Sequence, residues 1–277
     1  PASAGVYKGV FNVQVPLGSR FSLNEYNYIV IKKLDSGSYE YQLECETLGE
    51  EPNGNTGTLI PIEYIDGLTS AELTEILIPG EDEEETESLR ARYLNSFDTQ
   101  AYGGNIKDYE EKTLAISGVG SVKVTPVWQG GGTVRLTILD SEYDEASSAL
   151  IERVQETIDP TKDGTGKGIA PIGHIVTVDT PLKKSIHIAT NLTLEDIEVT
   201  NIKDDIDNAL MDYLLELRKN WAASNKIVIR ISQIETRILA INNKIIDIGN
   251  TKINGREENL EIDIYEIPVW GSGNYES

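Results

Sequence analysis

The side chains that most often carry out chemistry are scarce in this sequence of 277 residues. It holds two histidines, His174 and His187, and one cysteine, Cys45. Nucleophilic catalysis by serine or cysteine needs a neighbouring base such as histidine, and a zinc protease needs a His-Glu-x-x-His spacing that is absent. Two separated histidines also fall short of a three-histidine zinc site. We therefore predict that the protein is not an enzyme and has no catalytic residue, cofactor or metal.

Each of these three residues has an ordinary structural interpretation. Cys45 alternates with Tyr41 and Leu43, which indicates a buried thiol on a strand, and a single cysteine excludes an internal disulfide. His187 stands in an alternating apolar run, which places it on the polar face of a sheet. His174 follows Pro-Ile-Gly at the start of a strand, where we expect exposure to solvent.

Two stretches look like ligand loops but lack the required context. Residues 81–85 are all acidic, without the alternating spacing and turn glycine of a calcium loop. We interpret them as the start of a helix, where the helix dipole favours negative charge. Residues 163–168 read Asp-Gly-Thr-Gly-Lys-Gly, but they follow a predicted helix, precede Pro171 and lack the Walker spacing. We predict a flexible connector there.

The charge balance narrows the range of partners. Lysine and arginine number 24 against 46 aspartates and glutamates, which gives a net charge of −22. Such a surface repels phosphate backbones and anionic lipid, so we predict no nucleic acid partner and no membrane insertion. No apolar run approaches the length of a membrane span, and we expect no signal peptide. The chain begins at Pro1 and its only methionine is Met211, so we expect a fragment or a processed product.

The length and a hydrophobic content of 39% are those of a folded protein with more than one core. We predict the fold class α+β and a multidomain chain. An N-terminal antiparallel β domain is followed by two αβ sandwich modules, of which the middle one is ferredoxin-like. The expected domains are a β-rich domain at 1–80, a middle αβ domain at 81–180 and a C-terminal αβ domain at 181–277.

The β domain is predicted from alternation and turn chemistry. Apolar residues alternate with polar ones over 28–30 and 39–45, the period of half-buried strands. Sequences rich in Pro, Gly, Asn and Ser separate these runs and favour tight turns. Two shorter strands are expected at 59–62 and 76–78.

The middle region begins with an amphipathic helix. Leu89, Tyr93 and Phe97 recur at spacing four and make one apolar stripe. The glycine pair at 103–104 ends this helix, and Asn105 is a suitable N-cap for a second helix.

A hairpin and a further helix complete this region. Strands over 122–128 and 134–138 flank a triple glycine, which predicts a hairpin with a flexible tip. A helix over 146–158 and a strand over 172–178 follow. The order helix, strand, strand, helix, strand favours a ferredoxin-like split βαβ module.

The third region holds an alternating strand and a long helix over 202–217 with acids in its first turn. Ser232 begins the sequence Ser-Gln-Ile-Glu, which is typical of a capping box at a helix start. We expect strands at 245–248 and 260–264 to pair with each other. The tail at 271–277 is expected to fray.

Several stretches, taken in order, resemble the baseplate J-like family. They include Tyr-Gly-Gly-Asn-Ile-Lys-Asp-Tyr at 102–109, Gly-Val-Gly at 118–120 and the eleven residues at 124–134. Ile-Asp-Pro at 158–160 and Ala-Pro-Ile-Gly-His at 170–174 also match. The resemblance spans nearly the whole chain. The motif positions that carry it are Leu89, Arg90, Arg92, Gly103, Gly104, Asn105, Asp108, Tyr109, Gly118, Val119, Gly120, Pro126, Trp128, Gly130 and Gly132.

This family consists of wedge proteins of contractile phage tails and prophage-derived tail-like particles. The resemblance implies a structural subunit, assembled in copies into a ring around the tail hub and in contact with other wedge proteins. It further implies a place in the baseplate of a virion or tail-like particle made in the bacterial host cytoplasm, and a role in transmitting the contraction trigger. Family members usually carry a helical segment before the position of Pro1. We predict interfaces through the helices at 83–97 and 202–217, whose acidic faces would meet basic patches.

Two other functions stay open from the residues alone. A carbohydrate-binding or adhesin module of a phage or cell surface is the main alternative, with Trp128, Trp221 and Trp270 as a sugar platform. Such residues are more often core or interface anchors. A hydrolase with paired carboxylates is the weakest alternative, because acidic pairs are abundant here by composition alone.

Overall fold

The computed structural model describes residues 1–34, 37–95 and 103–276. Helices and strands are mixed, and the chain separates into two compact units. The first unit comprises residues 1–142 and 146–179, and the second comprises residues 143–145 and 180–277. The predicted α+β class is confirmed at this level, whereas the domain boundaries at 80 and 180 stay predictions.

The first unit begins with a sheet of seven strands in the order β5-β7-β1-β4-β3-β2-β6. Every pairing within it is antiparallel, which confirms the N-terminal antiparallel β domain. The strands are β1 Ala4–Phe11, β2 Arg20–Leu23, β3 Tyr26–Lys33, β4 Glu40–Leu48, β5 Gly57–Thr58, β6 Ile60–Pro61 and β7 Ala71–Ile78.

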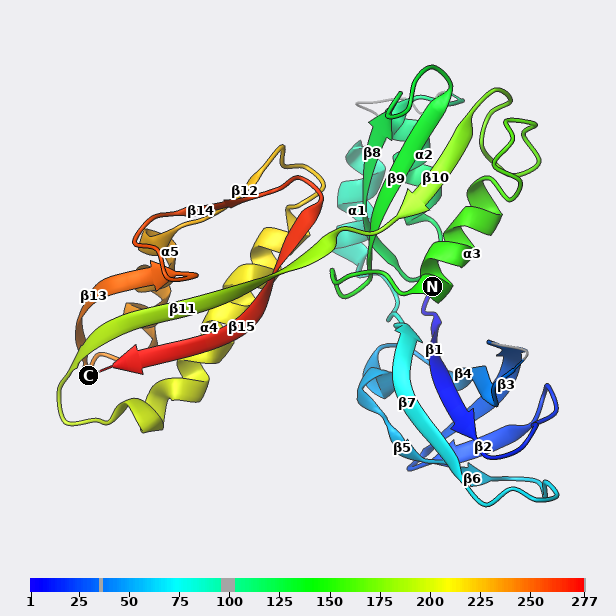
Figure 1. Ribbon diagram of the computed structural model, residues 1–277, viewed down its shortest axis with the longest axis horizontal. Coiled ribbons are helices and arrows are strands. Elements are labelled where there is room, and N and C mark those ends of the chain that lie inside the picture. The colour runs from blue at the N-terminus through cyan, green and yellow to red at the C-terminus, as the bar shows by residue number, and fades with distance from the viewer. Residues whose placement is uncertain (35–36, 96–102, 277) are drawn as a thin grey trace. The chain divides into compact units, whose positions relative to one another are not determined.

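This sheet closes into a barrel. β5 and β6 stand at opposite ends of the strand order, yet only Leu59 separates them in the sequence. Neighbouring strands lie about 4.8 Å apart, so one residue cannot bridge the two edges of a flat seven-stranded sheet. The sheet therefore curls until both edges meet at Leu59, and the strands coloured blue to cyan in Figure 1 follow this curl.

Aromatic side chains fill the barrel. Tyr7 packs edge-on against Tyr28 with ring centroids 5.2 Å apart, and Phe11 lies 5.0 Å from Phe21. Such aromatic pairs add stabilisation to that which comes from burying their apolar surface. Cys45 belongs to the same buried cluster, which confirms the prediction of a buried strand thiol. Burial raises the pKa of this thiol, which disfavours the thiolate, the nucleophilic form of cysteine.

The rest of the first unit follows the predicted order of elements. Its elements are α1 Thr86–Asn95, α2 Ile106–Leu114, β8 Val119–Pro126, β9 Thr133–Asp140, α3 Ser148–Ile158 and β10 Ile175–Asp179. β8 and β9 form the predicted antiparallel hairpin. β10 pairs directly with β9 in parallel, with Val176 opposite Val134. The ferredoxin-like detail is not confirmed, because a split βαβ unit needs another strand between these two, and the described residues place none there.

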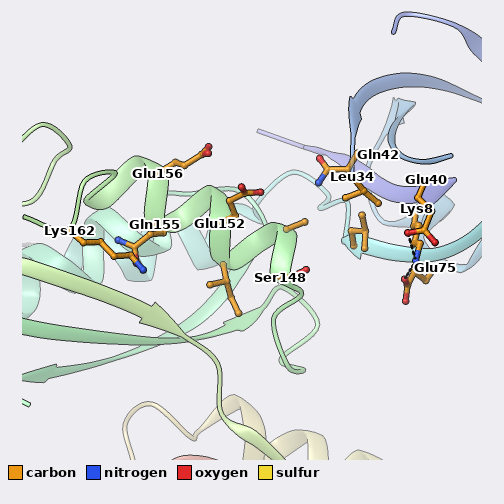
Figure 2. A pocket seen from close by; sticks show the side chains of 13 residues that line it. Lys8, Leu34, Glu40, Gln42, Glu75, Ser148, Glu152, Gln155, Glu156 and Lys162 are labelled. Carbon is orange, nitrogen blue, oxygen red and sulfur yellow. Dashed lines mark ion pairs between the residues drawn. The ribbon is translucent and has the colours of Figure 1, made fainter. Parts of the chain in front are cut away.

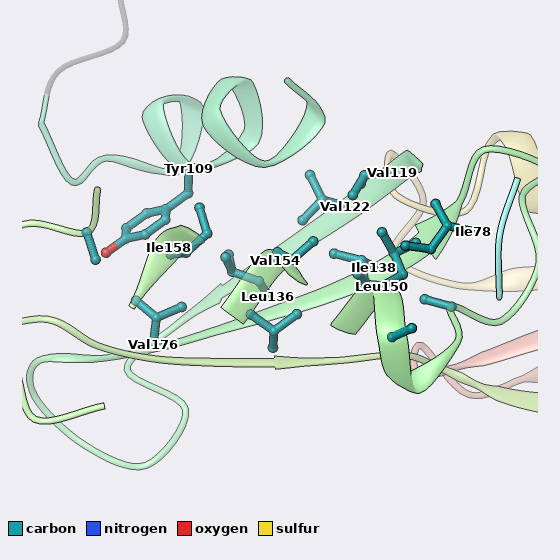
Figure 3. Close-up of a cluster of buried hydrophobic side chains, with 14 of the residues drawn as sticks. Ile78, Tyr109, Val119, Val122, Leu136, Ile138, Leu150, Val154, Ile158 and Val176 are labelled. Carbon is teal, nitrogen blue, oxygen red and sulfur yellow. The ribbon is translucent and has the colours of Figure 1, made fainter. Parts of the chain in front are cut away.

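One hydrophobic core joins this sheet to its helices. Figure 3 shows Tyr109 from α2 and Leu150 and Val154 from α3. They share this core with Leu136 and Ile138 of β9. Val6 of β1 and Ile78 of β7 belong to the same core. The ends of two barrel strands are thus buried with the helices and the second sheet, which explains why these parts form one compact unit.

The outer edge of β10 is covered by side chains. Gln155 donates from Nε2 to the Val176 carbonyl at 3.1 Å and accepts from the Val178 N–H at 3.0 Å. Asp159 accepts from the Val176 N–H at 3.0 Å. These bonds satisfy backbone groups that would otherwise be open to pairing with another strand. Asp159 belongs to the Ile-Asp-Pro stretch, so that stretch has a role at the sheet edge.

The second unit contains two small sheets and two helices. Its elements are β11 Leu182–Leu194, α4 Val199–Lys219, β12 Ile227–Ile229, α5 Ile231–Ile241, β13 Ile245–Ile253, β14 Leu260–Ile262 and β15 Glu266–Glu276. The order β13-β11-β15 makes one sheet, and β12 pairs with β14. Along β11, Ile186, Ile188 and Leu192 are buried and their neighbours are mostly exposed, so one side of this strand is covered and the other is open. Trp221 is buried after α4 and donates from Nε1 to the Ile264 carbonyl at 3.0 Å.

Three predictions for this unit are wrong. β13 pairs with β11 and not with β14: β11 takes β13 on one edge and β15 on the other, and β14 pairs with β12. The tail is not frayed, since residues up to Glu276 pair with β11 as part of β15. The capping box at Ser232 does not form: α5 begins at Ile231, and the Ile231 N–H donates to the side chain of Asn259 at 3.0 Å.

The shared core of the first unit yields a stability prediction. Leu136 on the central strand β9 is fully buried, and replacing it by alanine leaves a cavity. We expect Leu136→Ala to lower the free energy of unfolding by about 2–5 kcal/mol. Urea unfolding monitored by circular dichroism measures the change.

The matched control is Leu114→Ala at the end of α2, where the leucine is exposed. We expect this variant to lie within about 0.5 kcal/mol of the wild type. Equal effects of the two substitutions would contradict the assignment of the core.

Candidate functional site

Two stretches of the family resemblance, far apart in the sequence, meet in the first unit. Gly104 has a positive φ of 94°. A Cβ at this position would lie 2.9 Å from Cε1 of His174 and 3.1 Å from Cγ of Pro171. Only glycine therefore fits where the start of α2 approaches the loop before β10. We call these residues, together with Asp108 and Tyr109, the α2 joint.

The N-terminus of α2 is capped within this joint. Asn105 has extended backbone angles, and its Oδ1 accepts from the Asp108 N–H at 2.7 Å, which confirms the predicted N-cap. Asp108 in turn accepts from the Gly104 N–H at 2.9 Å. The side chain of Asn105 thus binds the backbone N–H of Asp108, and the side chain of Asp108 binds the backbone N–H of Gly104.

Asp108 also ties α2 to the loop before β10. Its carboxylate lies 2.9 Å from Nζ of Lys112, which donates to the Ile169 carbonyl at 3.2 Å. Burial by itself raises the pKa of Asp108. The hydrogen bond from Gly104 and the charge of Lys112 outweigh that effect, so the pKa is lowered. The carboxylate is ionised, and it is occupied by the hydrogen bond from Gly104 and the ion pair with Lys112.

Tyr109 and His174 form the other half of the joint. Tyr109 is buried, its hydroxyl lies 2.8 Å from Nδ1 of His174, and the two rings stack with centroids 5.9 Å apart. Burial, with the nearby charges of Asp108 and Asp159, raises the pKa of Tyr109 to about 12. The prediction that His174 is simply exposed is wrong, because the ring is half-buried against this tyrosine. Periodicity could not reveal this, since the partners are 65 residues apart.

The glycines at 118 and 120 mark two more close approaches. A Cβ on Gly118, which has a φ of 92°, would lie 2.5 Å from Cγ2 of Ile78 and 3.2 Å from Cδ1 of Leu150. A Cβ on Gly120 would lie 2.2 Å from the carbonyl oxygen of Asp140 on the paired strand. Both positions need the smallest residue for steric reasons.

The remaining glycines of the motif differ among themselves. Gly132 has a φ of 81°, and a Cβ there would lie 2.8 Å from the Gly173 carbonyl oxygen. Gly130 has a φ of 109° with open space around it, so its requirement is conformational only. Gly103 has open space around it and no positive φ.

Trp128 is half-buried in the hairpin of β8 and β9, with the guanidinium of Arg135 5.5 Å from the centroid of its ring.

The other motif positions do not converge on one place. Leu89 and Arg90 are exposed on α1, where Arg90 pairs with Glu87 at 3.1 Å. The side chain of Arg92 lies outside the described residues, as does Phe97 of the predicted apolar stripe. Val119 is buried in the core, and Pro126 is exposed at the end of β8.

The interpretation of the acid run as a helix start holds only for its last residue. The Leu89 N–H donates to the Glu85 carbonyl at 3.0 Å, whereas residues 81–84 precede the helix. α1 begins at Thr86, with Glu87 as the acid in its first turn. The Ser3 N–H donates to the Glu81 carbonyl at 2.8 Å, and Asp82 accepts from the Glu50 N–H at 3.0 Å. The start of the acid run is thus bound to the barrel, because its side chains and backbone find hydrogen-bond partners there.

The glycine-rich loop at 163–168 is a connector held by its own side chains. Asp163 accepts from the Thr165 N–H at 3.0 Å and from the hydroxyls of Thr161 and Thr165. These hydrogen bonds lower the pKa of Asp163 to about 2. The Gly173 N–H also donates to the Gly164 carbonyl at 2.8 Å. The Thr165 N–H that a phosphate would need is therefore already bonded to a carboxylate.

A groove of 760 Å³ lies between the barrel and α3 (Figure 2). On the barrel side Lys8 pairs with Glu40 at 3.2 Å and with Glu75 at 3.7 Å. On the α3 side Glu152 pairs with Lys32 of the barrel at 2.9 Å. The lining includes neither histidine nor cysteine, and these ion pairs neutralise much of its charge. Among the described residues no group of three or more His, Cys, Asp or Glu side chains is placed to hold a metal ion.

No helix in the described part of the chain is both long and apolar enough to cross a membrane.

The motif residues are best described as a set of packing joints: the α2 joint, the contact of Gly118 with Ile78, and the turn at Gly132. Each joint connects segments that are distant in the sequence.

Comparisons with known proteins identify the family of the chain. The baseplate J-like central domain matches residues 101–180. The Bacillus subtilis (strain 168) protein YqbT is 35% identical to this chain over 278 residues. The aligned region covers 99% of this chain and 76% of the length of YqbT. The phage-like element PBSX protein XkdT of the same organism is 35% identical over 275 residues. That alignment covers 98% of this chain and 75% of the length of XkdT. The chain belongs to the baseplate J-like family.

A solved structure also resembles the chain. It is the anti-feeding prophage baseplate, determined by electron cryomicroscopy with sixfold symmetrisation. The identity is 7% and the TM-score is 0.47, with 97% of this chain and 76% of the other covered.

The contact at Gly118 yields a second prediction. We expect Gly118→Ala to lower the free energy of unfolding by about 1–3 kcal/mol, because the new methyl group overlaps Ile78. Gly130→Ala is the matched control, since it has the same unfavourable sign of φ without a steric clash. Thermal unfolding compares the two variants. If Gly130→Ala were as destabilising as Gly118→Ala, the loss would be conformational and the packing role of Gly118 would be refuted.

Proposed function

We propose that this protein is a structural wedge subunit of a phage-type baseplate. In this role it has no enzymatic activity, assembles in several copies into a ring around the tail hub, contacts other wedge proteins and helps transmit the contraction trigger. The observation that carries the proposal is the identity of 35% over almost the whole chain with a protein of the phage-like element PBSX. Support also comes from the packing roles of Gly104, Asp108, Tyr109, Gly118 and Gly132, which resemble structural joints more than a reaction centre.

The proposal is tested on purified particles. The chain is tagged at its C-terminus and expressed in a host whose own copy of the gene is deleted, and particles are released and labelled for electron microscopy. We expect label at the distal end of the tail, where the baseplate lies. Label along the sheath, or normal particles without any label, would overturn the proposal.

The surfaces of the two helices that we predict to form interfaces differ from each other. α4 exposes acids at Asp204, Asp205 and Asp212, as the predicted acidic face requires. On α1 the exposed side chains include Leu89 and Leu94, so that helix offers apolar contacts as well as charge. We therefore assign the salt-sensitive contact with a basic neighbour to α4.

Salt dependence tests this assignment. Purified particles are incubated across about 0.05–0.5 M salt, over which screening of exposed charges becomes nearly complete. We expect increasing release of the wild-type chain, because the acids of α4 lose their attraction to basic side chains. Asp205→Asn with Asp212→Asn should weaken retention at low salt and flatten the dependence. Glu25→Gln, at an exposed barrel position, is the control and should behave like the wild type.

A further inference from the structure

The segment at 60–64, which begins with the short strand β6, exposes three apolar side chains. Ile60 is 64% exposed, Ile62 46% and Tyr64 88%. We call these three residues the β6 patch; β6 is labelled in Figure 1. Single exposed apolar residues are common on protein surfaces, but three within five residues indicate a contact site.

Folding of the barrel does not account for these residue types. The same segment places Leu59 in the buried core, and Ile65 and Leu68 pack against that core from the other end. Ile60, Ile62 and Tyr64 are not members of the core cluster. The segment is thus anchored by three apolar residues that point inward, while three others point outward.

The β6 patch is held in place before any partner arrives. The Ile62 N–H donates to the Arg20 carbonyl at 3.0 Å, and Ile60 pairs with Ser22 of β2. The hydroxyl of Tyr64 donates to Asp66 at 3.1 Å. A surface that is already ordered loses little conformational entropy on binding, which favours its use as a contact.

The charges around the patch define the partner. Glu63 and Asp66 flank it, and the positive charge of Arg20 is matched by the carboxylate of Glu46, with Arg20 Nε 2.5 Å from Oε1. The local surface is therefore acidic, as is the whole chain with its net charge of −22. A second copy of this acidic surface, nucleic acid and anionic lipid would all be repelled.

The shape of the strand indicates how the partner binds. β6 has only two residues, and Pro61 has no N–H to donate. Addition of a strand to this edge is therefore disfavoured. The contact must be made by side chains that enter a recess of the partner.

We propose that the β6 patch docks into an apolar recess, ringed by lysine or arginine side chains, on a neighbouring baseplate protein. This inference rests on the function proposed above. Tyr64 and Ile62 are the anchors, and Glu63 and Asp66 pair with the basic rim.

The test uses particles from a host that lacks its own copy of the gene and expresses the full chain or a variant. Quantitative mass spectrometry measures the amount of the chain per particle. We expect Ile62→Ser with Tyr64→Ser to reduce incorporation about tenfold or more, because loss of central anchors is the most costly change at an interface. Glu63→Lys should reduce it as well, by repulsion from the basic rim.

Leu48→Ser is the matched control, because Leu48 is 58% exposed on the same barrel but outside the patch. It should incorporate like the wild type. Thermal unfolding of each purified variant tests whether its fold is intact; if the double variant unfolds early, Tyr64→Ser alone takes its place, since this side chain is the most exposed of the three.

The outcomes separate the two proposals. Normal incorporation of well-folded patch variants overturns the docking proposal and leaves the baseplate function intact. Absence of the wild-type chain from particles overturns the baseplate function itself. If the purified wild type forms a dimer that Tyr64→Ser dissociates, the occupant is a second copy, and the proposed basic partner is wrong. Increased incorporation of Glu63→Lys likewise refutes a basic rim.

Discussion

The contact between Ile78 and Gly118 is the constraint on which the architecture of the first unit depends. Ile78 ends the last long strand of the barrel, and Gly118 precedes the first strand of the second sheet. Because Gly118 has no side chain, Ile78 enters the core formed by α2, α3 and that sheet. Val6 enters the same core from the neighbouring strand. Two barrel strands are therefore fixed in a second core, and a barrel that could be an independent domain becomes part of a larger compact unit.

The same physical principle explains much of the family resemblance. Gly104, Gly118 and Gly132 stand where a methyl group would overlap an atom of a distant segment, and Gly120 stands where it would overlap the paired strand of its own hairpin. Asp108 and Asp159 use their carboxylates to satisfy backbone N–H groups at a helix start and at a sheet edge. These residue types also occur in catalytic sites and ligand loops. Here their hydrogen bonds and close approaches hold segments of the chain together.

Several features could be read from the sequence because they depend on neighbouring residues. The alternation around Cys45 predicted a buried strand, and Asn105 with Asp108 three residues later predicted a helix start. The order of helices and strands between α2 and β10 also follows from local period and turn residues. The failures have a shared cause. The capping box at Ser232 and the acid run were assigned from local patterns, but Asn259 and Glu50 supply the partners that decide those backbone conformations.

The sequence alone determined the acidic surface, the α+β class, the antiparallel β domain and the family to which the chain belongs. Only the tertiary structure decided that β13 pairs with β11, that the C-terminal residues form β15, and that Tyr109 meets His174. It also decided that Leu59 closes a barrel and leaves Ile60 and Ile62 outside. The physical reason is that periodicity fixes which face of a strand is buried, whereas the identity of its neighbour depends on how distant segments share one core.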